Sequence, residues 1–257
     1  MRIIRVQYNE FSFYAALGAE NTIQCLHSPL GLNEPIPLSK IKVLPLVSPT
    51  KIICIDINYH EKAQELQQPI PTNPTFFFKP PSSIVGNGQP ILLPTNIGRV
   101  VSEAELCIVI GQTCYKVTPE AASNYIFGYT CANDITAKDI QQQEYTTSHA
   151  KAYNTFCPVG PWIETDVPNI ENLQIRNSIN SELGQVSTTA DMIFPPLELI
   201  SFLSNIMTLN PGDLILTGTP KGSLLISDGD IVQTSIENVG ILINPIEEYL
   251  PMETIVQ

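Results

Sequence analysis

Short apolar runs rich in branched side chains, separated by turn-forming residues, make up most of the chain. Such runs predict β-strands, because branched side chains suit the pleated, half-buried surface of a sheet. The strand candidates are residues 3–8, 11–17, 22–26, 51–57, 106–110, 125–132 and 214–217. Asn87-Gly88, before residues 89–93, predicts a hairpin turn. Residues 210–213 predict a turn into the last of these strands.

Helices are few in this pattern. Residues 119–124 and 196–207 are the best candidates, and the second has apolar residues at helical spacing. Many strands with few helices predict a mainly β protein with antiparallel or mixed sheets, not a doubly wound fold. Residues 45–50, with prolines at 45 and 49, are typical of a linker. We therefore expect a small β-rich segment over residues 1–47 and a main domain over residues 48–257.

Composition narrows the class of protein. Hydrophobic residues make up 43% of the 257 positions and charged residues 15%, as in a soluble globular protein. No stretch approaches the roughly 20 apolar residues of a membrane helix. The N-terminus lacks the continuous apolar region of a signal peptide, so we expect a cytoplasmic location. A formal net charge of −12 argues against nucleic acid and anionic membranes as partners.

The six cysteines show no CxxC or clustered spacing, and several lie inside apolar runs. They are interpreted as small buried residues, and their spacing argues against a disulfide scaffold or a zinc site.

Two glutamates, Glu103 and Glu105, precede the apolar run at residues 106–110. Side chains at i and i+2 of a strand leave the same face, so both carboxylates point to one place. Like charges held together beside an apolar run are costly unless a cation neutralises them. Asp134 follows the strand candidate at 125–132 and is well placed to join them. Three carboxylates form an all-oxygen site suited to Mg²⁺ or Mn²⁺. The alternative is two solvated acids at an exposed strand start, with Asp134 in an ordinary turn.

Four motifs in register identify a resemblance. They are the Glu-x-Glu pair, Gly-Tyr-x-x-x-Asn-Asp-x-Thr-Ala-Lys-Asp at residues 128–139, Phe-Cys-Pro-Val-Gly-Pro at 156–161 after Lys151, and Thr-Gly-Thr-Pro-Lys-Gly at 217–222. Together they resemble the fumarylacetoacetate hydrolase family over roughly four fifths of the chain, from near Ile53 to residue 245. The chain looks most like short, single-domain members that act on acylpyruvates, oxaloacetate or hydroxyheptadienedioate. The resemblance implies a mixed β-sandwich roll, usually a homodimer.

The resemblance also implies roles for particular residues. Glu103, Glu105 and Asp134 match the metal ligands, and Lys151 matches a lysine that offers positive charge to the developing enolate. The expected substrate contacts are Thr219, Gln141, Lys138 and Lys79. Lys138 replaces a residue that is commonly arginine, which gives up the bidentate fork of a guanidinium.

The upstream motif departs from the family. Members commonly carry a histidine and a glutamate as an acid/base pair on a short lid helix. Glu65 falls on the glutamate position, but Lys62 falls on the histidine, and Asp56 replaces a usual glycine. His60 lies two positions earlier, about 200° around a helix, and is expected on the surface. We therefore expect Lys62 and Glu65 in the catalytic set, with the water-activating step altered.

These features predict an enzyme that uses Mg²⁺ or Mn²⁺ and acts on a small anionic 2-keto acid, acylpyruvate- or oxaloacetate-like, through a metal-bound enolate. Hydrolysis of a C–C bond is the family default. Tautomerisation or isomerisation, and decarboxylation of a 2-oxo dicarboxylate, are the alternatives. A rival from another class is a catalytically idle homologue that binds metal and a keto acid.

Overall fold

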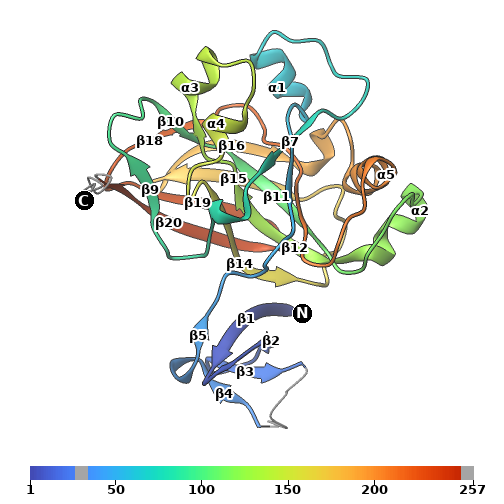
Figure 1. The fold of residues 1–257 in the computed structure, drawn as a ribbon, viewed down its shortest axis with the longest axis vertical. Coiled ribbons are helices and arrows are strands. Elements are labelled where there is room, and N and C mark those ends of the chain that lie inside the picture. Colours follow the sequence, from blue (N-terminus) through green and yellow to red (C-terminus); the bar gives the residue numbers. More distant parts are fainter. Residues whose placement is uncertain (27–33, 250–257) are drawn as a thin grey trace, which may run out of the picture.

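A computed structural model of the chain describes residues 1–26 and 34–249, and β-strands dominate it (Figure 1). The strands are β1 (Arg2–Tyr8), β2 (Phe11–Leu17), β3 (Thr22–Cys25), β4 (Ile36–Pro37), β5 (Lys42–Val43), β6 (Ile52–Ile55), β7 (Phe76–Lys79), β8 (Ile84–Val85), β9 (Ile91–Pro94), β10 (Val100–Ser102), β11 (Ala104–Ile110), β12 (Ile126–Asn133), β13 (Thr136–Ala137), β14 (Cys157–Glu164), β15 (Gln174–Ile179), β16 (Glu182–Thr188), β17 (Leu214–Leu216), β18 (Leu224–Ile226), β19 (Ile231–Ile236) and β20 (Gly240–Tyr249).

Helices are short, and none in the described part of the chain is long and apolar enough to span a membrane. The α-helices are α1 (His60–Glu65), α2 (Pro119–Ala122), α3 (Lys138–Gln143), α4 (Ser148–Lys151) and α5 (Pro196–Ile206). The 3₁₀ turns are η1 (Leu38–Lys40), η2 (Pro81–Ser83), η3 (Ser123–Tyr125) and η4 (Thr189–Asp191). The prediction of a mainly β fold with few helices is confirmed.

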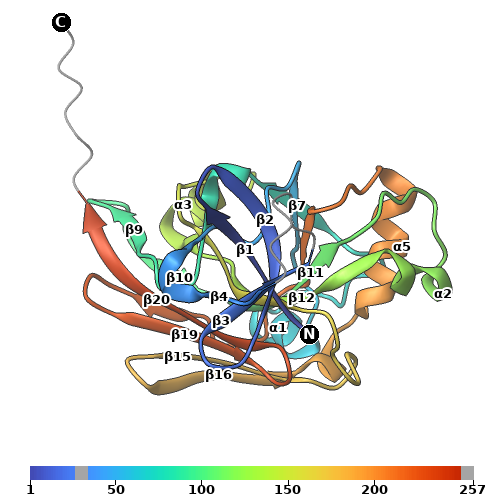
Figure 2. The same ribbon diagram turned by 90° about the horizontal axis from the view of Figure 1, so that it is seen from below.

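The largest sheet runs in the order β4-β3-β2-β1-β14-β12-β11-β17-β6-β7, with β5 beside β1 and β8 beside β14. Most neighbours are antiparallel, but β17 pairs with β6 in parallel, so the sheet is mixed. A five-stranded sheet, β16-β15-β19-β20-β9, forms an outer layer that Figure 2 shows edge-on. A small third sheet, β13-β10-β18, lies near α3 and α4 (Figure 1).

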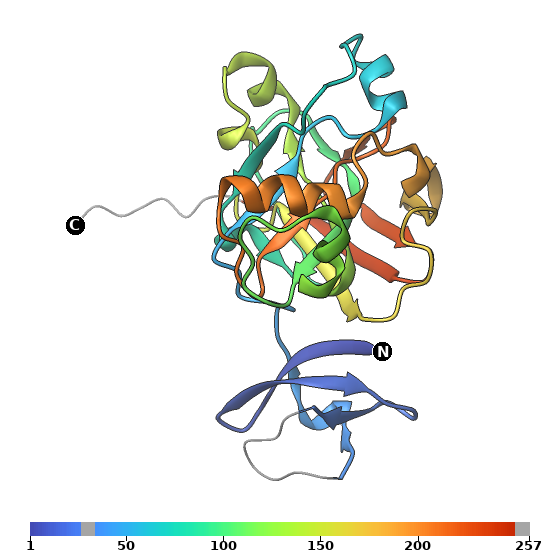
Figure 3. The same ribbon diagram turned by 90° about the vertical axis from the view of Figure 1, so that its right-hand side faces the viewer.

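Side-chain alternation in β6 explains how the main sheet is covered on both faces. Ile53 and Ile55 pack with Leu199 and Leu203 of α5, while Ile52 and Cys54 pack with the N-terminal strands. Figure 3 shows α5 lying across one side of the molecule beside α2. Successive strand residues face opposite sides, so a strand buried on both faces is apolar throughout, as β6 is.

The N-terminal strands β1 to β5 project below the main body in Figure 1, yet they are tied to it. Arg2 pairs with Glu164 of β14, and Ile3 and Phe13 belong to the same hydrophobic cluster as Val159. The boundary expected at residue 47 falls in the segment before β6 and stays a prediction. Residues 27–33 and 250–257, which belong to the two predicted segments, lie outside the described residues.

One element prediction is wrong. Residues 86–89 do turn, with Gln89 N donating to Gly86 O at 3.3 Å, but the flanking strands do not pair with each other. β8 pairs with β14 and β9 pairs with β20, both in parallel. The turn instead docks onto β20, where Asn87 Oδ1 accepts a hydrogen bond from Ile243 N at 2.9 Å. Tertiary pairing overrides the local hairpin signal.

Candidate active site

Four adjacent strands of the main sheet place polar side chains at one edge. Ala104 at the start of β11 pairs with Asn133 at the end of β12. β17 runs antiparallel to β11 and parallel to β6, so both of these strands end at the same edge. The residues that follow or flank these strand ends line one cavity of about 280 Å³ (the α1, α3 and α4 end of Figure 1). They are Asp56, Glu103, Glu105, Asp134 and Thr219.

The expected grouping of Glu103, Glu105 and Asp134 is what the fold produces, since all three are buried and line this cavity. Glu103 lies between β10 and β11, Glu105 lies within β11, and Asp134 follows β12. Asn133 Oδ1 accepts a hydrogen bond from Glu103 N at 2.8 Å, and Asp134 N donates to Glu103 O at 2.8 Å. These bonds hold the two acidic segments together.

Glu103 is the most heavily engaged of these acids. Its Oε1 accepts from Ser223 Oγ at 2.7 Å and from Lys138 Nζ at 3.4 Å. Its Oε2 accepts from Thr136 Oγ1 at 2.9 Å and from Lys151 Nζ at 3.0 Å. Burial raises the pKa of Glu103, but the nearby lysines outweigh it and hold the pKa well below the ordinary range. Glu103 is therefore an ionised carboxylate.

Asp134 lies between two buried lysines. Lys79 Nζ donates to Oδ1 at 2.6 Å, and Lys151 Nζ contacts Oδ2. Burial by itself would lower the pKa of Lys151, but Asp134 and Glu103 outweigh it and raise that pKa, so the side chain is an ammonium. Lys79 also donates to Ile135 O at 3.2 Å and is not part of the cavity wall. The expected contact between Lys79 and substrate is therefore not supported by this structure.

Glu105 differs from the other two acids. Among the described residues, the one hydrogen bond to its side chain comes from Gly218 N, which donates to Oε2 at 2.7 Å. Burial, and next the charge of Asp134, raise the pKa of Glu105 well above its ordinary value. Within residues 1–26 and 34–249 no ion pair engages this carboxyl group, and Glu105 lines the cavity.

The chemistry of this donor set fits a hard divalent cation. All three acids offer oxygen, and no described cysteine or histidine lines the cavity. A cation beside Glu105 would favour its charged form against the burial that raises its pKa. Among the described residues, no group of three or more acidic, histidine or cysteine side chains is arranged in this structure so that it could hold a metal ion. An ion shared by Glu103 and Asp134 would compete with the ammonium of Lys151 for their oxygens. Glu103, Glu105 and Asp134 are the residues that would hold it.

The lid helix α1 is fastened by Lys62. Its Nζ donates to Glu65 Oε2 at 2.8 Å and to Ser223 Oγ at 2.9 Å, and lies 3.8 Å from Glu103 Oε1. Glu65 Oε1 accepts from Gly222 N at 2.9 Å. Burial raises the pKa of Glu65, but these donors outweigh it and hold the pKa below its ordinary value. Lys62 lines the cavity, whereas Glu65 is not part of the cavity wall and accepts a hydrogen bond from Lys62.

Three of the expected substrate contacts lie at the cavity, and His60 lies on the surface. Lys138, Gln141 and Thr219 line the cavity, and Lys138 Nζ donates to Gln141 Oε1 at 3.0 Å. Thr219 Oγ1 accepts from Gln185 Nε2 at 3.0 Å, which fixes the hydroxyl. His60 is exposed at the first position of α1, as expected.

Sequence reasoning gave no role to Asp56, Ser223 or Gln185. Ser223 directly follows the Thr-Gly-Thr-Pro-Lys-Gly motif, and its position beside that motif was the available signal. Gln185 lies on β16, far away in sequence, and no local pattern singles it out. From the sequence, Asp56 stands out only because it replaces the usual glycine of the family motif. It lines the same cavity as Lys151 and Phe77.

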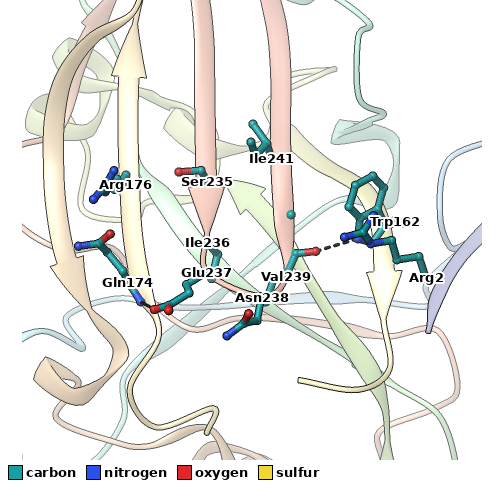
Figure 4. A pocket seen from close by; sticks show the side chains of 11 residues that line it. Arg2, Trp162, Gln174, Arg176, Ser235, Ile236, Glu237, Asn238, Val239 and Ile241 are labelled. Atoms are coloured by element: carbon teal, nitrogen blue, oxygen red, sulfur yellow. Dashed lines mark hydrogen bonds between the residues drawn. The ribbon is translucent and has the colours of Figure 1, made fainter. Parts of the chain in front are cut away.

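A larger hollow of about 600 Å³ lies elsewhere, over β14, β15, β19 and the start of β20 (Figure 4). Arg2 stacks on Trp162 there with its guanidinium carbon 4.4 Å from the ring centre, and Trp162 Nε1 donates to Val239 O at 2.7 Å. Among the described residues of its wall, Glu237 is the single acid, and no histidine or cysteine lies beside the Ser235 hydroxyl. We therefore do not assign catalysis to it.

The cysteines take no part in this chemistry. Five are buried, and Cys25 is half-buried. Burial raises the pKa of Cys131 and of Cys157 to about 12, which leaves these thiols protonated and unreactive.

Comparisons with known proteins find relatives over most of the chain. The model of the fumarylacetoacetate hydrolase C-terminal family matches residues 51–247. The mitochondrial oxaloacetate tautomerase fahd2 of Xenopus laevis is 38% identical over 240 residues, covering 88% of this chain and 75% of the relative. An uncharacterised protein of Archaeoglobus fulgidus is 43% identical over 210 residues, covering 81% and 83%.

Solved structures are similar across nearly the whole chain. A 5-carboxymethyl-2-hydroxymuconate delta-isomerase from Mycobacterium smegmatis has a TM-score of 0.87 and 35% identity, and covers 97% of this chain and 99% of its own. A maleylpyruvate hydrolase from a Sphingobium species, in complex with manganese and pyruvate, has a TM-score of 0.79 and 30% identity, and covers 96% and 99%.

Proposed function

The chain belongs to the fumarylacetoacetate hydrolase family and is an enzyme, and from this premise we propose that it is a keto–enol tautomerase. The proposed substrate is a small 2-keto dicarboxylic acid such as oxaloacetate, and the proposed cofactor is Mg²⁺ or Mn²⁺. Similarity to a named oxaloacetate tautomerase and to a named isomerase supports this reaction class. A bound divalent cation would polarise the 2-keto group and stabilise its enolate form.

The observation that carries the choice of reaction is the engagement of Lys62. Its ammonium donates to Glu65 and Ser223, so it cannot at the same time accept a proton from water. Hydrolysis needs a base that activates a water molecule as the nucleophile, whereas tautomerisation needs proton exchange at carbon 3 and at the keto oxygen but no nucleophilic water. The lid therefore favours tautomerisation over C–C cleavage.

The charges on the cavity wall support an anionic substrate that binds together with the cation. With all groups ionised, four carboxylates line the described cavity wall against the three ammonium groups of Lys62, Lys138 and Lys151. A divalent cation would reverse that balance, and the cavity would then attract an anion. The Thr219 hydroxyl and the Gln141 amide would bind the substrate's polar groups, and the Lys151 ammonium would offset negative charge that develops on its keto oxygen.

Hydrolysis of an acylpyruvate is the second candidate, favoured by the similarity to the maleylpyruvate hydrolase solved with manganese and pyruvate. One experiment separates the candidates. The protein is stripped of metal, reloaded with Mg²⁺ or Mn²⁺, and given oxaloacetate, acetylpyruvate and fumarylpyruvate while enol loss and cleavage products are followed. We expect rapid, metal-dependent loss of the oxaloacetate enol with little cleavage. Fast cleavage would favour hydrolysis, pyruvate formation from oxaloacetate would favour decarboxylation, and inertness towards all three would favour an idle homologue.

A further inference from the structure

Asp56 is the one acid of the cavity wall to which neither the metal site nor the lid gives a role. It directly follows β6, and its backbone N donates to Thr75 O at 3.0 Å, which fixes the strand end. Its side chain lines the same cavity as Lys151 and Glu105. Within residues 1–26 and 34–249, no hydrogen bond or ion pair engages its carboxylate, and the residue keeps solvent access.

The other acids near the cavity are committed elsewhere. Both oxygens of Glu103 accept hydrogen bonds, and both oxygens of Asp134 contact lysines. Glu65 accepts from Lys62 and from Gly222 N. Glu105 belongs to the metal-binding set. A carboxylate that must take up and release a proton needs a free oxygen within the cavity that would hold the substrate, and Asp56 lines that cavity with no described partner for its carboxylate.

We propose that Asp56 is the catalytic residue that exchanges a proton with carbon 3 of the 2-keto acid, a role that rests on the proposed tautomerase function. In the keto-to-enol direction the Asp56 carboxylate takes the proton from carbon 3. The electron pair of the broken C–H bond forms the C2=C3 double bond, and the carbonyl π pair moves to the keto oxygen. That oxygen takes a proton from water, and Asp56 returns its own to solvent. No oxidant or further reactant is needed.

The surroundings of Asp56 suit proton exchange. Burial raises its pKa, Lys151 on α4 opposes that rise, Glu103 and Asp134 add to it, and Lys138 on α3 opposes it, with a net rise. An acid whose pKa lies closer to neutrality is a more effective proton carrier at neutral pH.

A second role is conceivable for an anion at this place, because a carboxylate could simply repel anionic substrates. The two roles predict opposite kinetics. A repelling charge raises KM and leaves kcat unchanged, whereas a proton carrier controls kcat.

The test uses the metal-loaded full chain and three variants. Asp56→Asn removes the basic oxygen with little change of shape, and Asp56→Glu keeps a carboxylate. Asp166→Asn makes the same charge change at an exposed site away from the cavity and serves as the control. The readouts are kcat and KM for oxaloacetate tautomerisation, exchange of the carbon 3 hydrogens for deuterium, and the calorimetric affinities for Mn²⁺ and oxalate.

For Asp56→Asn we expect kcat and the deuterium exchange rate to fall by about 100-fold or more, with oxalate and Mn²⁺ affinities within about threefold of wild type. Asp56→Glu should retain part of kcat, and Asp166→Asn all of it. An unchanged kcat with a lower KM would establish the repelling role and overturn the proposal, as would a loss of oxalate binding in parallel with kcat. An inert wild type would remove the tautomerase function and with it the role of Asp56. An active wild type with an equally active Asp56→Asn variant would remove the role of Asp56 alone.

Discussion

Lys62 Nζ lies 2.9 Å from Ser223 Oγ, so the lid helix α1 is fastened to the loop that follows β17. The same hydroxyl donates to Glu103 Oε1 at 2.7 Å, which connects the lid to a candidate metal ligand. Ser223 therefore contacts both the lid helix and a candidate metal ligand, and Lys62 Nζ itself lies 3.8 Å from Glu103 Oε1.

Lys62→His should convert a fastening residue into one that can accept a proton, because free histidine titrates near pH 6.5. We expect slow acylpyruvate cleavage by the wild type and a gain of about 10-fold or more in the variant, within the range typical of general base catalysis. Cleavage rates of acetylpyruvate at pH 7.5 measure this gain.

Lys221→His is the matched control for that substitution, since Lys221 lies on the same loop but is exposed and pairs with Glu61 at 3.1 Å. It should leave cleavage unchanged. Fast cleavage by the wild type, with no gain in Lys62→His, would mean that Lys62 acts as a base itself.

Glu105→Ala should weaken Mn²⁺ binding by at least about 10-fold and abolish activity, because it removes one of the three carboxylates assigned to the ion. Isothermal titration calorimetry of the metal-free protein with Mn²⁺ measures the affinity. Glu61→Ala, which removes an exposed carboxylate of α1, should bind Mn²⁺ as the wild type does. Equal Mn²⁺ affinities in both variants would show that Glu105 does not bind the ion.

Lys151→Met should weaken oxalate inhibition while metal binding is retained. Oxalate is a planar dianion that resembles the enolate of a 2-keto acid, and the Lys151 ammonium would face its charge at the cavity wall. Competitive inhibition constants with and without Mn²⁺ measure this. If oxalate binds the metal-free wild type as tightly as the loaded enzyme, the inhibitor does not depend on the ion.

Asp213→Asn should destabilise the fold by roughly 3 kcal/mol at pH 7, because it breaks a buried pair. Asp213 accepts from Lys51 Nζ at 2.5 Å, Thr50 Oγ1 at 2.7 Å and Asn210 N at 2.8 Å. Burial raises the pKa of Asp213, but these donors outweigh it and hold the pKa below its ordinary value.

The pH dependence of that effect has a definite sign. A carboxyl group whose pKa is lower in the folded state than the unfolded value near 3.9 stabilises the fold at higher pH. That stabilisation is lost as the pH falls through the folded-state pKa. Urea denaturation at pH 7, 4 and 3 should therefore show the advantage of wild type over Asp213→Asn shrinking below about pH 4. An advantage that does not change with pH would show that the hydrogen bonds, not the charge, are responsible.

Much of the fold follows from local patterns that the sequence carries. Strand existence was predicted where branched apolar residues gather, as in β6 and β11, because burial on both faces demands an uninterrupted apolar run. Helix α5 was predicted from apolar residues at helical spacing. The pairing of Glu103 with Glu105 on one face also follows from the two-residue repeat of a strand.

Only the tertiary structure decided which distant residues meet. Lys79 carries the same charge as Lys151, but β7 places it behind Asp134 and away from the cavity. The turn at residues 86–89 is local, whereas its flanking strands choose partners in β14 and β20. Lys62 becomes a donor because the chain folds Ser223 against it, 161 positions away. The sequence by itself determined several of the strands, helix α5 and the spacing of the acids, since these depend on neighbouring residues. The roles of Lys62, Lys79 and Asp56 depend on contacts across the sheet, which no local pattern encodes.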